Sequence, residues 1–278
     1  MRSIDHVVMP FETLGGSRDW FDRLGFTVAP DAVHPFGTGN ACVFLADGRF
    51  IEPLAVVDMA NYEAAEGEGH LFVMRDAAAR ALADRPGISA LAFRSDDAVA
   101  DREQLMAAGV GEEEFVHFER AMRLPDGGKA QLAFRLAFAK MMSGGAPNFF
   151  YCEARHRVQP DRSSLIAHRN GATGIARMTV ASNDRDRALD YLMAVAGSQP
   201  QEGCAGSSEV PLAGGTLELV SGGARPLTID SVTITVADLA FAKDFWQGQG
   251  VESSNDGEGV AVPCPNGRGV IRFIEVKS

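Results

Sequence analysis

The segment Ser3-Ile4-Asp5-His6-Val7-Val8 recurs near the end of the chain as Thr228-Ile229-Asp230-Ser231-Val232-Thr233. A second segment, Arg49-Phe50-Ile51-Glu52, recurs unchanged as Arg272-Phe273-Ile274-Glu275. The third residue of the first segment and the glutamate of the second are 46 positions apart in one copy and 44 in the other. Self-similarity of this kind marks a structural unit that is used more than once, so the sequence predicts a duplicated fold.

Each copy contains the same predicted elements in the same order. In the first copy, β-branched residues predict a strand over residues 4–9, and Trp20 and Phe21 mark the apolar face of a short helix. Asp47-Gly48 predicts a hairpin turn. The three later strands are expected at residues 26–29, 41–46 and 50–56. The unit is therefore βαβββ.

Three further copies follow this pattern. Their strands are expected at residues 88–94, 130–139 and 148–153, then 175–181 and 215–220, then 231–236, 259–264 and 269–276. Their helices are expected at residues 98–108, 184–196 and 239–247. All four copies keep a glutamate in the last strand, namely Glu52, Glu153, Glu218 and Glu275. Only the first keeps a histidine, because Ala90, Arg177 and Ser231 stand at the positions matched to His6.

Turn-forming residues over positions 159–174 interrupt the pattern and divide the chain into two domains. The first domain is predicted over residues 1–160, with modules 1–56 and 88–153 joined by a connecting segment, 57–87. Within this segment a helix is expected at residues 76–83, and the segment could cover the mouth of a cavity. The second is predicted over residues 170–278, with modules 174–222 and 228–278. A chain of 278 residues suits two domains of roughly 100 to 200 residues each. The fold class is α+β.

The charge of the chain limits the classes of partner that it can bind. A formal net charge of -11 and a pI near 5.0 argue against binding to nucleic acid or to an anionic membrane. No apolar run approaches the roughly 20 residues that span a bilayer, and no secretion signal is recognisable, so a cytoplasmic protein is expected. The four cysteines are single and far apart, as in reduced proteins, and none is assigned to zinc or catalysis.

Four motifs resemble a known group of proteins. They are Ile4-Asp5-His6-Val7-Val8, Gly37-Thr38-Gly39-Asn40-Ala41, Phe149-Phe150-Tyr151-Cys152-Glu153 and His168-Arg169-Asn170-Gly171-Ala172-Thr173-Gly174-Ile175. Together with the tandem βαβββ units, they look like the glyoxalase-like domain group of the vicinal oxygen chelate superfamily. That superfamily includes glyoxalase I, extradiol dioxygenases and the bleomycin resistance proteins. The resemblance covers the whole chain in module order and about half of it in motifs.

The resemblance implies that two modules pair through curved mixed sheets, and that these sheets form a half-open cup around one divalent metal ion. The ligands implied in this chain are His6, Glu52 and Glu153, with Glu52 also acting as the catalytic base. Alternate side chains of a strand share one face, so His6 is expected on the same face as Ile4 and Val8. Such ligands suit Zn, Fe, Mn, Ni or Co. For Glu153 an ion pair with the arginines that follow it is an equal explanation.

Five residues are candidates for substrate binding. His34 lies in the loop before the predicted third strand, and Phe149 and Tyr151 lie in the motif that ends at Glu153. These aromatic side chains either pack the core or line the cup. His168 and Arg169 either form an interdomain turn or face an anionic group of a substrate.

Two functions from different classes follow. The first is a divalent-metal-dependent lyase, isomerase or dioxygenase that acts on a small oxygenated substrate. The second is a metal-free protein that binds or sequesters a small molecule, as the bleomycin resistance branch of the resemblance implies. Ala90 cannot ligate a metal, which favours the second. The modules pair either within one chain or between the chains of a homodimer.

Overall fold

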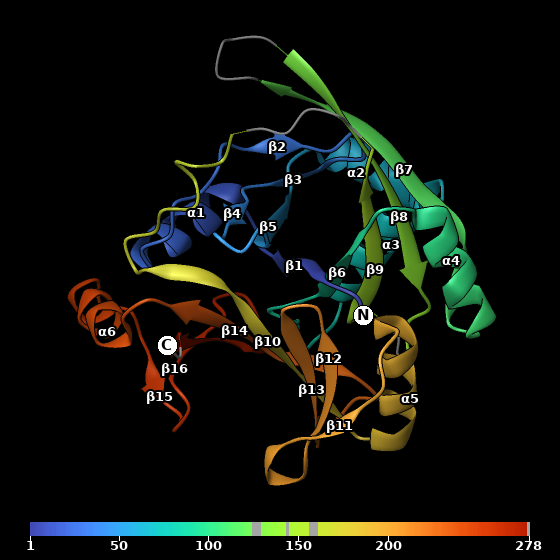
Figure 1. The fold of residues 1–278 in the computed structure, drawn as a ribbon. Helices are drawn as coiled ribbons and strands as arrows, with labels where there is room; N and C mark the ends of the chain where they lie inside the picture. The colour runs from blue at the N-terminus through green and yellow to red at the C-terminus, as the bar shows by residue number, and fades with distance from the viewer. Residues whose placement is uncertain (124–128, 143–144, 156–160, 277–278) are drawn as a thin grey trace.

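The structure is a computed structural model that describes residues 1–123, 129–142, 145–155 and 161–276. The chain folds into two curled mixed sheets, one above the other in Figure 1. All strands of the first sheet precede residue 155, and all strands of the second follow residue 171. Residues 156–160, at the end of the predicted first domain, lie outside the described part. The limits at 160 and 170 stay predictions.

The first sheet is built from the first half of the chain. Its strands are β1 (Ile4–Pro10), β2 (Ala32–Val33), β3 (Thr38–Asn40), β4 (Val43–Phe44), β5 (Phe50–Val56), β6 (Ala90–Ser95), β7 (Gly111–Arg123), β8 (Lys129–Ala139) and β9 (Asn148–Ala154). Its helices are α1 (Leu14–Arg23), α2 (Met59–Gly67), α3 (Leu71–Arg80) and α4 (Ala98–Ala107). The strand order is β2-β3-β5-β1-β6-β9-β8-β7, with β4 also pairing with β5.

The second sheet repeats this design. Its strands are β10 (Ala172–Ser182), β11 (Gln201–Glu202), β12 (Ser208–Leu212), β13 (Gly215–Ser221), β14 (Thr228–Val236), β15 (Ser254–Asn255), β16 (Val260–Pro263) and β17 (Val270–Glu275). Two α-helices, α5 (Arg185–Ala196) and α6 (Leu239–Gly248), and a short 3-10 turn, η1 (Cys204–Gly206), complete it. The order is β11-β12-β13-β10-β14-β17-β16-β15.

The pairing of strands confirms the predicted duplication. In the first sheet, β1 is parallel to β5 and β6 is parallel to β9, while β1 and β6 meet antiparallel. In the second sheet, β10 and β14 meet antiparallel in the same way, and each is parallel to the last strand of its own module. Two βαβββ modules therefore join through their first strands in each half of the chain, and the α+β fold with four modules is confirmed.

Side-chain caps fix where most helices begin. In five helices, the side chain of the N-cap residue accepts a hydrogen bond from a backbone N–H in the first turn. These caps are Thr13 for α1, Asp58 for α2, Asp97 for α4, Asp184 for α5 and Asp238 for α6. Such caps satisfy amide groups that have no partner within the helix. None of the helices in the described ranges is both long and apolar enough to cross a membrane.

Three local predictions in the first half of the chain differ from the structure, and in the second half the strands β11, β12 and β15 were not predicted. Residues 26–29 form no strand, because the module continues instead into the short strands β2 and β3. The thirteen-residue strand β7 was not predicted, since its glutamates hide the alternation of its inward residues Val116 and Phe118. The connecting segment forms two helices, α2 and α3, where one was expected at residues 76–83.

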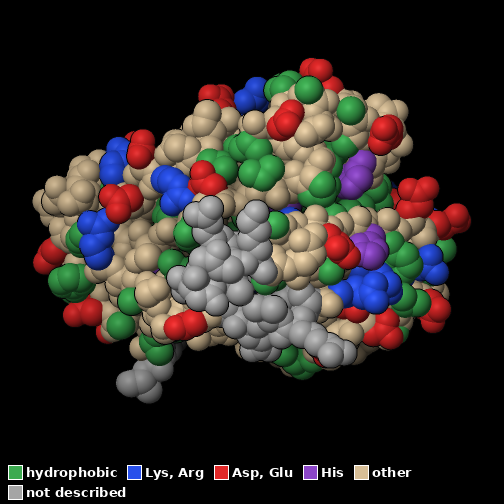
Figure 2. Space-filling model, turned by 90° about the horizontal axis from the view of Figure 1, so that it is seen from above, with side chains coloured by type: hydrophobic (Ala, Val, Ile, Leu, Met, Phe, Trp, Pro, Cys, Tyr) green, Lys and Arg blue, Asp and Glu red, His purple; other side chains and the backbone are tan. Residues whose placement is uncertain are grey.

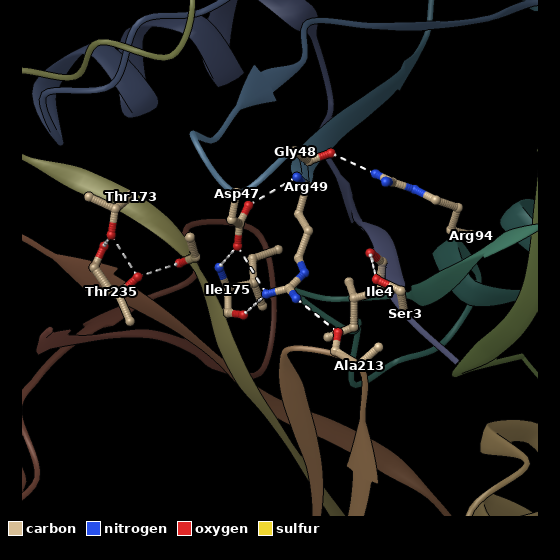
Figure 3. Close-up of polar contacts among 11 residues, drawn as sticks. Ser3, Ile4, Asp47, Gly48, Arg49, Arg94, Thr173, Ile175, Ala213 and Thr235 are labelled. Carbon is tan, nitrogen blue, oxygen red and sulfur yellow. Dashed lines mark hydrogen bonds and ion pairs between the residues drawn. The ribbon is translucent and has the colours of Figure 1, made fainter. Parts of the chain in front are cut away.

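The two halves of the chain dock through the Asp47-Gly48 turn, whose glycine has a φ of +85°. Figure 3 shows the Arg49 guanidinium donating hydrogen bonds to the carbonyl oxygens of Ile175 and Ala213 in the second sheet. The Asp47 carboxylate accepts the backbone N–H of Ile175 at 2.9 Å. Because Arg49 is only 9% exposed, these bonds lie in a largely dry interface.

The surface carries charges of both signs. On the face seen in Figure 2, acidic and basic side chains are interspersed. A face of this kind has no continuous basic stripe on which a phosphate backbone could lie.

Candidate functional site

A cavity of about 560 Å³ lies inside the curl of the first sheet. Side chains from both modules line it, on strands β1, β3, β4 and β5 of the first module and β6 to β9 of the second, with helix α3 of the connecting segment. Seven of the lining residues are phenylalanines. The size falls in the range of cavities that hold small organic ligands.

Asp5 and His6 both face this cavity, although they are neighbours on β1. The pairing of β1 with β6 shifts register between Ile4 and His6, and such an irregularity re-aims the side chains next to it. Ile4 consequently belongs to the core on the opposite face of the sheet, with Val7 and Ile51, and does not share the face of His6 as predicted. Val8 does lie on the cavity side.

Glu52 meets His6 at the floor of the cavity. The parallel register of β1 and β5 places His6 beside Phe50 and Val8 beside Glu52, so the imidazole and the carboxylate lie on adjacent strands and the same face. Nε2 of His6 is 3.3 Å from Oε2 of Glu52, and Nδ1 is 2.8 Å from Oδ2 of Asp5. The predicted convergence of His6 and Glu52 is therefore present in the fold.

Burial and hydrogen bonding set the charges of this pair. Burial alone would lower the pKa of His6, but hydrogen bonds to Asp5 and Glu52 and the charges of both carboxylates raise it to about 9. Burial would raise the pKa of Glu52, but the hydrogen bond and charge of His6 lower it to about 2. At neutral pH the pair is thus an imidazolium and a carboxylate.

Asn40 and His34 complete the polar floor. The Asn40 amide donates to Oε1 of Glu52 at 2.5 Å. His34, predicted as a substrate-binding residue, does line the cavity, with Nδ1 2.8 Å from Oγ1 of Thr38 and Nε2 4.0 Å from Glu52. Burial lowers the pKa of His34 to about 4, with help from the charges of Arg120 and His6. The role of Asn40 was missed, although it lies in a motif that carries the resemblance.

Glu153 does not join His6 and Glu52. Its carboxylate accepts the backbone N–H of Ala98 at 3.2 Å, at the first turn of α4. It also lies 3.5 Å from Arg155 and 3.9 Å from Arg135. Because successive side chains of a strand point to opposite faces, Phe150, Cys152 and Ala154 line the cavity while Glu153 points away. The ion-pair explanation therefore fits this residue, and the expected ligand role does not.

Counterparts of His6 and Glu52 follow when Phe150 is matched to Phe50, since both phenylalanines line the cavity. His6 lies beside Phe50, and in the second module Ala92 lies beside Phe150. Two residues after these phenylalanines come Glu52 and Cys152. The sequence matched Ala90 and Glu153 to this pair, but Ala90 lies beside Asn148 and Glu153 beside Ser95, so the two do not stand in the relation of His6 to Glu52. A one-residue slip moves a side chain to the opposite face.

Few donor atoms for a metal ion gather in the described part of the cavity. Within the described ranges, no group of three or more His, Cys, Asp and Glu side chains is arranged to hold a metal ion. Burial raises the pKa of the Cys152 thiol well above its usual value, so it stays protonated. His6 and Glu52 alone are one donor short of the three protein ligands of typical catalytic sites.

The other predicted substrate-binding residues lie outside the cavity. Phe149 and Tyr151 point into the core on the opposite face of β9, where the Tyr151 hydroxyl donates to the carbonyl of Val195. His168 accepts the backbone N–H of Thr27 at 3.0 Å. Arg169 pairs with the Asp22 carboxylate at 2.6 Å. These contacts give Phe149 and Tyr151 a packing role and make the His168-Arg169 turn an interdomain contact.

Three arginines that were not predicted line the cavity: Arg94, Arg120 and Arg162. Arg94 contacts Asp5 at 3.4 Å and donates to the carbonyl of Gly48 at 2.9 Å (Figure 3 shows the second contact). Arg120 comes from β7, the strand that the sequence did not reveal. Alternation along β7, with Phe118 also in the cavity, is the signal that could have found Arg120.

An ion pair occupies the matching position of the second sheet. Thr179 lies beside Glu218, as Val8 lies beside Glu52, which puts Arg177 where His6 stands. Arg177 lies 3.2 Å from the carboxylates of both Glu218 and Glu258, and Thr179 donates to Glu218 at 3.0 Å. This half of the duplication therefore carries a cross-strand salt bridge where the first half carries the His6–Glu52 pair.

Comparisons with known proteins agree with this fold. The model of a family described as glyoxalase-like domain matches residues 4–195. None of the curated proteins compared matches the sequence significantly. A hypothetical protein from Staphylococcus aureus has a similar structure, with a TM-score of 0.70 and 15% identity over 99% of this chain and 100% of the other.

Two further solved structures share the fold. One is a mutant of 4-hydroxymandelate synthase from Streptomyces coelicolor, with a TM-score of 0.60 and 13% identity over 99% of this chain and 92% of that one. The other is the Mn(II)-bound glyoxalase from Novosphingobium aromaticivorans, with a TM-score of 0.57 and 10% identity over 99% and 83%. At these identities the similarity establishes the fold and leaves the reaction open.

Proposed function

The chain belongs to the glyoxalase-like domain family, and on that premise we propose that it binds a small organic molecule in the cavity of the first sheet without a metal ion held by His6 and Glu52. The cavity is concave, rich in phenylalanine and furnished with a few polar side chains at its floor. Such a combination is typical of small-molecule sites, where apolar walls supply affinity and a few polar groups set orientation.

One observation carries the metal-free part of this proposal. The atoms that would ligate a metal already satisfy one another, since Nε2 of His6 faces Oε2 of Glu52 and the Asn40 amide donates to Oε1. Asp5 holds the remaining ring nitrogen of His6. The second module offers Ala92 and a protonated Cys152 where further ligands would be needed. A closed polar network of this kind presents hydrogen-bonding groups to an organic ligand without a cation at its centre.

A metal-dependent enzyme is the second candidate. His6 and Glu52 are residue types that bind divalent metals, and they converge on one face at 3.3 Å. The Mn(II)-bound glyoxalase has the same fold. This candidate needs donors beyond these two, and the arrangement of the described His, Cys, Asp and Glu side chains offers none.

Metal analysis separates the two candidates. The protein should be purified without chelator and its metal content measured by mass spectrometry beside that of the His6→Ala, Glu52→Ala double variant. We expect less than one metal ion per ten chains in both proteins. Stoichiometric metal that disappears in the double variant would overturn the metal-free proposal and favour the enzyme.

Ligand binding tests the cavity itself. A neutral aromatic probe, 2-naphthamide, should bind the native protein in calorimetry and lose its affinity in Ala154→Trp, because Ala154 lies at the exposed rim of the cavity and tryptophan would fill it. Phe241→Trp is the matched control, since Phe241 is exposed on α6 of the second half. Equal binding by Ala154→Trp and native protein would place the probe elsewhere and count against the proposal.

A further inference from the structure

Two arginines of the cavity are without an ion-pair partner among the described residues. Among the described residues, neither Arg120 nor Arg162 forms an ion pair, whereas Arg94 is held by Asp5. Nε of Arg120 is buried and has no hydrogen-bond partner there. A guanidinium is charged at every pH that a protein experiences, and removing it from water is costly unless an anion compensates. The described side chains that line the cavity carry four positive charges, on Arg94, Arg120, Arg162 and the imidazolium of His6, against three acidic side chains, Asp5, Glu52 and Asp96, so one positive charge is left over.

Aromatic rings fix both guanidinium groups. Cζ of Arg162 lies 3.9 Å from the centre of the Phe44 ring, and Cζ of Arg120 lies 5.8 Å from the centre of the Phe134 ring. Contact with a ring occupies a face of the guanidinium plane and leaves the N–H groups at its edges free to donate. Those edges match the two oxygens of a carboxylate.

The two arginines also lie near one another. Burial lowers the pKa of Arg162, and the positive charges of Arg120 and Arg94 act in the same direction, whereas the charge of Asp5 opposes them. An anion placed between Arg120 and Arg162 would relieve their mutual repulsion. The His6–Glu52 pair is charge-matched internally, so it suits an uncharged polar group at another point of the same ligand.

We infer that the ligand of this cavity is an aromatic carboxylate, with its ring against the phenylalanines and its carboxylate held by Arg120 and Arg162. This inference deepens the proposed function and rests on it. Seven phenylalanines line a cavity of about 560 Å³, which is large enough for one or two fused rings with a carboxyl group. The recognition requires both parts: a flat apolar body and a single anionic end.

Calorimetry with four probes tests the inference: 2-naphthoate, its neutral amide 2-naphthamide, acetate and inorganic phosphate. We expect 2-naphthoate to bind at least about tenfold more tightly than the amide, and acetate and phosphate to bind more weakly than either. Acetate lacks the ring, and phosphate lacks it as well while carrying more charge. If phosphate binds as tightly as 2-naphthoate, the site is a general anion site and the inference is wrong.

Variants of Arg120 and Arg162 test whether these side chains hold the carboxylate of the ligand. Arg120→Gln and Arg162→Gln should each weaken 2-naphthoate at least about tenfold and leave 2-naphthamide unchanged. The lysine variants should recover part of the affinity, because lysine keeps the charge and loses the planar fork. Arg187→Gln, on exposed α5, removes the same charge far from the cavity and should change nothing. Melting temperatures measured alongside would reveal a variant that fails to fold.

The outcomes separate this inference from the proposed function. If 2-naphthamide binds as tightly as 2-naphthoate, or if the glutamine variants keep the affinity for 2-naphthoate, the cavity function stands and the carboxylate inference is overturned. If neither aromatic probe binds at millimolar concentration, both fail.

Discussion

Nε2 of His6 lies 3.3 Å from Oε2 of Glu52 across two neighbouring parallel strands, with both side chains buried. The pair joins two positions that are 46 residues apart in the chain. Asp5 on the other ring nitrogen and Asn40 on the other carboxylate oxygen extend it into a network across the floor of the cavity.

Removing the Glu52 charge should change the protonation of His6. Because Glu52 and Asp5 together hold the pKa of His6 near 9 against burial, Glu52→Gln should lower that pKa by at least about one unit. Titration of the imidazole by nitrogen-detected NMR measures it. Glu153→Gln is the control, since Glu153 lies outside the cavity. An unchanged His6 pKa in Glu52→Gln would contradict the contact.

The stability of the fold should depend on pH through the three buried groups. The pKa of His6 is raised from 6.5 to about 9, so its contribution is complete below pH 6.5 and is lost as the pH rises toward 9. The pKa of His34 is lowered from 6.5 to about 4, so stability is lost as the pH falls across that interval. The pKa of Glu52 is lowered to about 2, which adds a loss below pH 4.5.

These three effects together predict a maximum in the free energy of unfolding near pH 6.5. Urea denaturation at a series of pH values measures it. In the double variant His6→Gln, Glu52→Gln the decline between pH 6.5 and 9 should be shallower, because the group that loses its proton there is gone. A native protein whose stability rises steadily from pH 6.5 to 9 would disagree with the raised pKa of His6.

Glu153 should matter for stability and not for binding. Its carboxylate caps the first turn of α4, so Glu153→Gln should lower the free energy of unfolding by about 1 kcal/mol. Binding of 2-naphthamide should stay within a factor of two of the native value. Loss of probe binding in this variant would show that Glu153 acts in the cavity after all.

A carboxylate at position 152 should strengthen metal binding in the cavity. Cys152 lines the cavity at the position equivalent to Glu52, so Cys152→Glu would add a third ligand beside His6 and Glu52. We expect Mn(II) to bind this variant at least about tenfold more tightly than the native protein in calorimetric titration. Cys204→Glu, which alters an exposed cysteine, is the control. No gain in affinity would argue against the assigned register of β9.

Arg49 should hold the two halves of the chain together. Its guanidinium donates to the carbonyls of Ile175 and Ala213, so Arg49→Ala leaves buried acceptors unpaired and should lower the free energy of unfolding by about 2 kcal/mol. Urea denaturation and limited proteolysis both report on the change. Arg23→Ala, at an exposed site on α1, should stay within about 0.5 kcal/mol of native. Equal free energies of unfolding for the two variants would show that Arg49 does not stabilise the contact between the two halves of the chain.

Part of the site was readable from the chain. The repeat and the period-two pattern identified β1 and β5 to within one residue at each end, and with them the facing pair His6 and Glu52. The ends of strands this apolar and regular can be recognised in the sequence. Parallel pairing of the first and last strands of the module then brings the side chains of His6 and Glu52 together.

The rest of the site depended on registers that no local pattern reveals. Glu153 was matched to Glu52 because both end a strand, but β9 presents Cys152 to the cavity instead. Arg120 belongs to a strand whose charged residues conceal it, and Arg162 lies beyond the end of the first sheet. Arg120 reaches the cavity only because the second module curls around the first.

The sequence by itself determined the duplicated α+β architecture and the His6–Glu52 pair. Repeated motifs, apolar alternation and turn residues can be recognised along the chain without knowledge of its tertiary contacts. The tertiary structure alone decided which side chains of the second module face the cavity, and that Arg120 and Arg162 face it with no ion-pair partner among the described residues. The physical reason is the two-residue period of a strand: a shift of one residue in pairing turns every side chain to the opposite face.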